Sequence, residues 1–205
     1  HNQSRRQRQM CIRDRLKDDQ GRVTVAGYSD DVRAVSERET RAVAAMPSVD
    51  AQLKRELGLG NNEIPGERLE SAIMRPAIVI RGISGGGVGP EARNIIEPTA
   101  RASLNLRLVP GQKPEALLAA LKAHFEKLGM TVSPEGPDAD AARERHLQMV
   151  PRPGGYRSFR TSIDADVVGD LKVILDRLGD QETLITPTMG AVSYTHLTLP
   201  TTLVV

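Results

Sequence analysis

The sequence predicts an α+β fold in which helices pack on one face of a small antiparallel sheet. Three observations favour it: residues 99–109 alternate strictly between polar and apolar side chains, residues 77–83 are rich in β-branched side chains, and residues 114–128 place leucines and a phenylalanine at helical spacing. A period of two with one polar face is typical of a strand buried on one side, as in antiparallel sheets. Helices on one face of such a sheet define the α+β class.

The first part of the chain predicts one strand and two helices. Residues 21–25 form a short strand candidate after a polar turn. Ser36 and Glu39 make a capping-box pattern, so we expect a helix from Glu37 to about Met46. We expect Ser48 to cap a second short helix that Gly58 closes, because glycine is the common residue at a helix C-terminus.

The middle of the chain supplies the sheet and its covering helix. The glycine-, asparagine- and proline-rich residues 58–68 predict a loop, and a glycine-rich turn at 84–90 follows the first sheet strand. Pro114 suits the first turn of a helix, and Gly129 closes that helix. Residues 130–132 then start another strand.

The last part of the chain resembles a piece of a different layer. Residues 133–145 are rich in proline, glycine, aspartate and alanine, as at a domain boundary. Apolar residues at helical spacing predict an amphipathic helix over 166–178, and 183–186 is a short strand candidate. A helix followed by a short strand suggests a partial α/β segment after the α+β domain.

Composition and charge exclude several classes of function. The 205-residue chain is 39% hydrophobic with no apolar run near the ~20 residues of a membrane helix, and its start lacks a secretory apolar region. Five arginines and one aspartate give residues 1–15 a charge of +4, so the formal total of +2 leaves −2 for residues 16–205. Aromatic residues make up 2% of the chain. We therefore expect a cytoplasmic protein without nucleic-acid or membrane partners.

Candidate metal and nucleotide sites are weak. The G-x-G-x-x-A pattern at 87–92 is not followed by a helix, which a dinucleotide site requires. His124 and His146 stand alone, without another ligand at metal-binding spacing. Asp164 and Asp166 lie at the start of a predicted helix and suit N-capping and compensation of the helix dipole. We expect no metal site and no catalytic cluster in this chain.

Two arginines and one asparagine could bind a substrate. Arg107 lies on the polar face of a strand, where surface solubility is the alternative. Arg160 stands just before a helix, where its guanidinium could grip a carboxylate through paired hydrogen bonds. Asn94 follows the glycine-rich turn and could donate to a carbonyl or carboxylate.

The order of several motifs carries a family resemblance. The chain reads GISGG at 82–86, ARNIIEP at 92–98 and LRLVPGQ at 106–112, with GRVTVAGYSDDV upstream at 21–32 and PTMG downstream at 187–190. This order resembles the lid, or dimerisation, domain of the di-zinc metallopeptidases that include carnosine dipeptidases, acetylornithine deacetylase and carboxypeptidase G. The resemblance implies a ferredoxin-like lid and an enzyme that hydrolyses a peptide or amide bond in a small carboxylate-bearing substrate.

The resemblance also implies roles and partners. The two zinc ions would be held outside this sequence, so this chain would supply a lid, a homodimer surface and a carboxylate clamp, and would be inactive alone. Arg160 would bind the carboxylate of a peptide or N-acyl amino acid, Asn94 would assist at the amide carbonyl, and Gly190 would line the cleft floor. Arg107 would serve the structure of the lid. The alternative is a non-catalytic α+β dimerisation or regulatory module.

Both ends of the chain differ in character from the rest. The stretches QMCIRDR at 9–15 and VSYTHLTLPTT at 192–202 resemble translated sequencing-adaptor read-through, so Cys11, His1 and His196 receive no functional role. The expected organisation is then an adaptor-like tail at 1–15, a lid at 16–135 with a helical insertion at about 30–75, a return into a catalytic domain at 146–190, and a second adaptor-like tail at 191–205.

Overall fold

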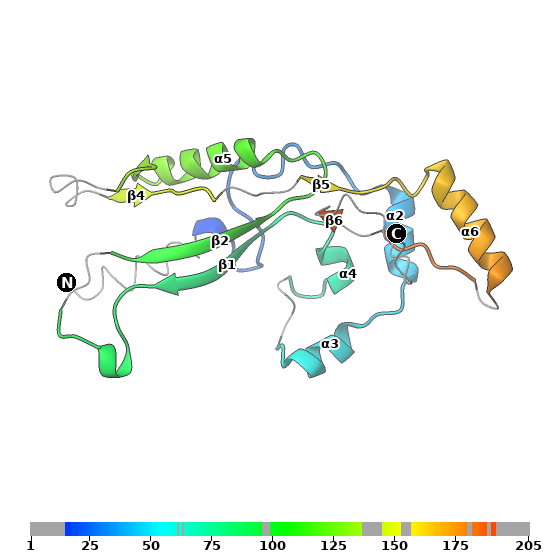
Figure 1. The fold of residues 1–205 in the computed structure, drawn as a ribbon, viewed down its shortest axis with the longest axis horizontal. Helices are drawn as coiled ribbons and strands as arrows, with labels where there is room; N and C mark the ends of the chain where they lie inside the picture. Colours follow the sequence, from blue (N-terminus) through cyan, green and yellow to red (C-terminus); the bar gives the residue numbers. More distant parts are fainter. Residues whose placement is uncertain are drawn as a thin grey trace.

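The computed structural model describes residues 15–60, 62, 64–95, 99–136, 145–152, 157–179, 182–187 and 190–191. Figure 1 shows an elongated arrangement, with a long two-stranded ribbon and a covering helix toward one end and the helix α6 at the other. The adaptor-like tails, apart from Arg15 and Ala191, lie outside the described residues.

The two predicted sheet strands pair as an antiparallel ribbon. Strand β1 (Ala77–Ser84) runs against β2 (Arg101–Arg107), from the pair Ala77 and Arg107 to the pair Ser84 and Arg101, with a register shift between Ile80 and Gly82. Helix α5 (Pro114–Lys127) lies along one side of this ribbon (Figure 1). The α+β class is confirmed.

Two further strand pairs extend the architecture. Strand β3 (Thr131–Ser133) pairs in parallel with β4 (His146–Gln148), and β5 (Ser158–Phe159) pairs antiparallel with β6 (Gly190–Ala191). The sequence did not predict β4, β5 or β6. Each has two or three residues, which is too short to show a period.

The main hydrophobic core lies between the ribbon, α5 and the first described segment. Helix α5 contributes three residues spaced four apart, as expected for one helical face. β1 and β3 each contribute one, and the chain before α2 contributes the rest. The cluster comprises Leu16, Val25, Tyr28, Ile78, Leu117, Leu121, Phe125 and Val132. Tyr28 also donates its hydroxyl to the Ala77 carbonyl oxygen at 3.2 Å, and burial raises the pKa of Tyr28.

Two of the helices between residues 37 and 58 form close to their expected positions. Helix α2 (Glu37–Ala45) begins with the predicted capping box, and α3 (Asp50–Leu57) ends at Gly58 with a positive φ of 64°. Ser48 does not cap α3, because Val49 is the N-cap residue and its N–H donates to Glu70 Oε1 at 3.3 Å. Glu70 belongs to α4 (Leu69–Ala72), a four-residue helix that the sequence analysis missed.

Three other predictions were wrong in detail. Residues 21–25 form no strand; Val23 makes an isolated bridge with Lys17. Residues 183–186 are not a strand; they line a small hollow against α6 (Asp166–Leu178). Neither aspartate caps α6, because Ala165 is the N-cap residue and Asp164 instead pairs with Arg38, Oδ1 to Nη1, at 2.5 Å. Asp166 does lie in the first turn of α6, where a negative charge complements the helix dipole.

The turn after β2 joins the ribbon to the first segment of the chain. Gln112 is buried; its Oε1 accepts from the Val109 N–H at 3.0 Å and its Nε2 donates to the Tyr28 carbonyl oxygen at 2.5 Å. Gly111 has a φ of +99°, and a Cβ there would collide with the Asp31 carbonyl oxygen. The Pro-Gly-Gln turn is therefore a packing feature that requires glycine at this position.

We predict that Gly111→Ala destabilises the chain more than Gly129→Ala. Both glycines have a positive φ, but nothing lies within 4 Å of a Cβ built on Gly129. Gly129→Ala should therefore show only the backbone cost of about 1–2 kcal/mol. The collision with Asp31 should add at least about 1 kcal/mol in Gly111→Ala, measured by urea unfolding. Equal losses in the two variants would contradict this account of the turn.

Candidate functional site

The most buried charged groups of the described chain are Glu39 and Arg160. The Arg160 side chain is 1% exposed and the Glu39 side chain 3% exposed, and Nε lies 2.8 Å from Oε1. Glu39 belongs to the first turn of α2, and Arg160 directly follows β5. The pair therefore joins two segments that are far apart in the sequence.

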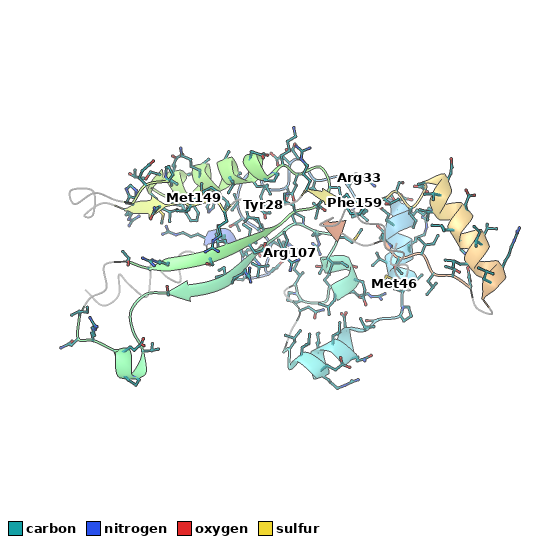
Figure 2. All side chains as sticks on the ribbon, in the orientation of Figure 1. Tyr28, Arg33, Met46, Arg107, Met149 and Phe159 are labelled. Carbon is teal, nitrogen blue, oxygen red and sulfur yellow. The ribbon has the colours of Figure 1, made fainter. Side chains whose placement is uncertain are left out.

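Neighbouring groups complete a small polar cluster around this pair. Glu39 Oε2 accepts from the Ser36 N–H at 2.8 Å as part of the capping box, and Arg160 Nη2 donates to the Ala34 carbonyl oxygen at 2.9 Å. Arg33 Nη1 donates to the Arg160 carbonyl oxygen at 3.4 Å, and Arg33 Nη2 lies 3.9 Å from Glu39 Oε1. Arg33 and Phe159 lie near each other beside β5 (Figure 2). One carboxylate thus sits among two guanidinium groups and a backbone N–H.

The guanidinium of Arg160 is incompletely hydrogen-bonded. Its Nη1 is buried without a hydrogen-bond partner, and the 2.8 Å contact of Nε with Glu39 Oε1 is an ion pair that lacks hydrogen-bond alignment. Burial lowers the pKa of Arg160, Glu39 opposes that shift, and Arg33 adds to it. Buried donors without partners are uncommon and point to strain or a ligand.

The predicted site residues are only partly brought together. Gly190 pairs with Phe159 across the β5–β6 ladder, so its backbone lies next to Arg160 in the fold. Asn94 is exposed and follows the short 3₁₀ turn η1 (Gly89–Glu91). That turn lies at the far end of the β1–β2 ribbon from β5 and β6 (Figure 1), so one copy of the chain does not place Asn94 beside Arg160.

The other weighed residues have plain structural surroundings. Arg107 is exposed at the end of β2, and its side chain makes no hydrogen bond or ion pair with any described residue. Figure 2 shows it on the ribbon, away from Arg33. His124 Nε2 lies 2.7 Å from the Arg15 carbonyl oxygen, and His146 Nε2 lies 2.9 Å from Ser133 Oγ. Each histidine therefore has a local partner.

The donor set does not fit the two zinc ions that the resemblance implies. Within the described ranges, no group of three or more histidine, cysteine, aspartate or glutamate side chains could hold a metal ion. The buried carboxylate of Glu39 lies against the guanidinium groups of Arg160 and Arg33, and guanidinium groups repel a cation. No catalytic step through a metal is assigned to these residues.

The partners of Arg160 were not predicted from the sequence. Glu39 was noticed in the sequence as part of the capping box with Ser36, and that local role needed no further partner. Arg33 stands in a polar stretch that showed no pattern. Charged residues in the first turn of an amphipathic helix are usually exposed. The burial of Glu39 results from tertiary contacts, so it can be seen only in the folded structure.

The part of the chain that the structure describes has no helix long and apolar enough to cross a membrane.

Comparison with known proteins identifies the family. The family model of the peptidase dimerisation domain, M20_dimer, matches residues 12–131, which is more than half of the chain. A search of curated proteins gives no match.

Among solved structures, the chain is similar to an M20 family metallo-carboxypeptidase, Sso-CP2, from Sulfolobus solfataricus. The TM-score is 0.63 at 24% identity, over 88% of this chain and 38% of that one. Human carnosine dipeptidase 1 gives a TM-score of 0.49 at 21% identity, over 58% of this chain and 26% of that one. The dipeptidase Dug1p from Saccharomyces cerevisiae gives 0.46 at 20% identity, over 59% and 26%.

The fold comparison rests on the first of these structures. This chain spans 38% of the length of that carboxypeptidase, and the likeness concerns the fold. The family-model match and the α+β architecture agree, and the chain belongs to the M20 peptidase dimerisation-domain family.

Proposed function

We propose that the chain is the lid and dimerisation part of a zinc-dependent peptidase or amidohydrolase. The substrate class is a small peptide or N-acyl amino acid with a free carboxylate. The observation that carries the proposal is the family match over 12–131, which includes the β1–β2 ribbon and α5. In this proposal the ribbon and α5 form the self-association surface, and the enzyme works in the cytoplasm.

The substrate-facing residues follow from the same proposal. Arg160 binds the substrate carboxylate, and the backbone of Gly190 lies next to it through the pairing with Phe159. Asn94 assists at the amide carbonyl. Because Asn94 lies away from Arg160 in one copy, it reaches the substrate only in an assembled or closed form. Arg160 can take up this role only if its contact with Glu39 opens.

The exposed apolar surface of α6 supports the proposal that residues 146–190 pack against a further layer of secondary structure. Val168 is buried, but Val167, Val173, Ile174 and Leu178 are between 50% and 80% exposed. A helix that exposes so much aliphatic surface usually packs on another element. The proposal therefore assigns this segment to the edge of a catalytic domain that carries the metal ligands.

We predict that the chain self-associates through the β1–β2 ribbon. Analytical ultracentrifugation at micromolar concentration should give a dimer, and Ile83→Glu should weaken it at least about tenfold, or about 1.4 kcal/mol. Ile83 is 45% exposed on β1, so the substitution leaves the core of one copy intact. Leu178→Glu on α6, where Leu178 is 80% exposed, is the matched control and should leave the dimer unchanged.

Two results would remove the dimerisation role. The first is a monomer across the whole concentration range. The second is a dimer that Leu178→Glu disrupts and Ile83→Glu does not, which would place the interface on α6.

We predict that the chain binds less than one zinc ion per molecule. The described residues hold no three-ligand group, and a structural or catalytic zinc needs at least three protein ligands. Equilibrium dialysis against zinc followed by metal analysis measures the stoichiometry. One or two tightly held zinc ions per molecule would contradict the proposal that the metal ligands lie outside this chain. In that case, loss of the ions in His124→Ala or His146→Ala would identify the ligands.

A further inference from the structure

Glu39 is surrounded by the donors that proteins use to bind a carboxylate. Arg160 Nε lies 2.8 Å from Oε1, Arg33 Nη2 lies 3.9 Å from the same oxygen, and the Ser36 N–H donates to Oε2 at 2.8 Å. Two guanidinium groups and a backbone N–H around one carboxylate form a typical anion-recognition set. The local charge of these three side chains is +1, so the cluster favours an anion.

Glu39 uses this set only in part. Its Oε2 is engaged by Ser36, so Oε1 alone faces Arg160 and meets Nε outside hydrogen-bond alignment. Arg160 Nη1 therefore has no hydrogen-bond partner, and it has little access to water because the residue is only 6% exposed. A carboxylate without a backbone tether could turn to face two nitrogens of the guanidinium, the paired geometry that arginine prefers.

The contact between Glu39 and Arg160 also links α2 to the β5–α6 segment. Three buried apolar residues lie outside the main core cluster around α5: Val43 in α2, Ile163 just before α6, and Val168 in α6. The other polar link across the same junction, Arg38 to Asp164, joins side chains that are 52% and 58% exposed. Exposed ion pairs contribute little to stability. The buried contact of Glu39 with Arg160 is thus the stronger polar link between α2 and the β5–α6 segment.

We propose that Arg33, Arg160 and the Ser36 amide form a carboxylate-binding site that Glu39 occupies as a tethered ligand, which latches α2 to the β5–α6 segment. The site takes small carboxylates when Glu39 is removed. Arg33 is 47% exposed, so a ligand can enter from its side. The inference deepens the carboxylate-binding role proposed for Arg160 by giving it a resident ligand, Glu39, and its test requires neither activity nor self-association.

Chemical rescue of Glu39→Ala tests the proposal. The variant leaves a carboxylate-sized space and an uncompensated buried guanidinium, so its thermal unfolding midpoint should fall by several degrees. Sodium acetate at 0.5 M should raise that midpoint more than the same concentration of sodium chloride or of acetamide. For a dissociation constant on the order of 50 mM, acetate should lower the unfolding constant about tenfold.

A matched control lies in the same helical turn. Glu37 also belongs to the first turn of α2, but its side chain is 94% exposed and only Arg41 faces it, at 3.6 Å. Glu37→Ala should therefore lose little stability and respond equally to acetate and chloride. A second variant, Glu39→Ala with Arg160→Gln, should lose the specific response to acetate because the guanidinium is gone.

Each outcome bears on the proposal. If Glu39→Ala is unfolded in low salt, acetate-driven refolding followed by circular dichroism replaces the thermal measurement, with the same chloride and acetamide comparisons. Equal effects of acetate and chloride on Glu39→Ala would overturn the proposal. So would an acetate response that survives Arg160→Gln. Neither result would affect the proposed dimer, which ultracentrifugation measures separately.

Discussion

The burial of two opposite charges constrains how α2 meets the β5–α6 segment. Glu39 and Arg160 lie almost completely out of water, and a charge in that position is tolerated only when an opposite charge or strong donors compensate it. Since Glu39 lies in the first turn of α2 and Arg160 precedes α6, the junction of these helices cannot move without exposing or orphaning a charge. The exposed pair of Arg38 and Asp164 follows from this placement.

The other half of the chain is held in a different way. There, aliphatic and aromatic side chains of α5 meet β1, β3 and the first described segment in one cluster. Gln112 and Gly111 then fasten the end of β2 to Tyr28 and Asp31. The part with the β1–β2 ribbon and α5 therefore depends on hydrophobic packing and a tight turn, whereas polar contacts join α2 to the β5–α6 segment.

Local sequence patterns predicted the elements that are long enough to show a period or that carry their own capping residues. The spacing of Leu117, Leu121 and Phe125 predicted α5, the alternation over 99–109 predicted β2, and the capping box predicted the start of α2. The short strands β4, β5 and β6 could not be predicted, because they exist only through pairing with distant segments.

The candidate site shows the same limit. Its arginine, Arg160, was selected from the sequence, but its partner was not. Glu39 already had a complete local role as a helix cap, so nothing in the sequence required a second one. Ser48 failed as a cap for the related reason that α4 supplies Glu70 to the N-terminus of α3. Tertiary contacts outweighed the local signal at both positions.

The central claim is that Glu39 and Arg160 stabilise the junction as a pair. A double-mutant cycle with Glu39→Gln and Arg160→Gln in urea unfolding measures their coupling directly, and Glu39→Gln keeps an oxygen that can accept from Ser36. The account predicts a coupling free energy above about 1 kcal/mol, with the double variant more stable than the two single losses imply. Single losses that add within about 0.5 kcal/mol would contradict it.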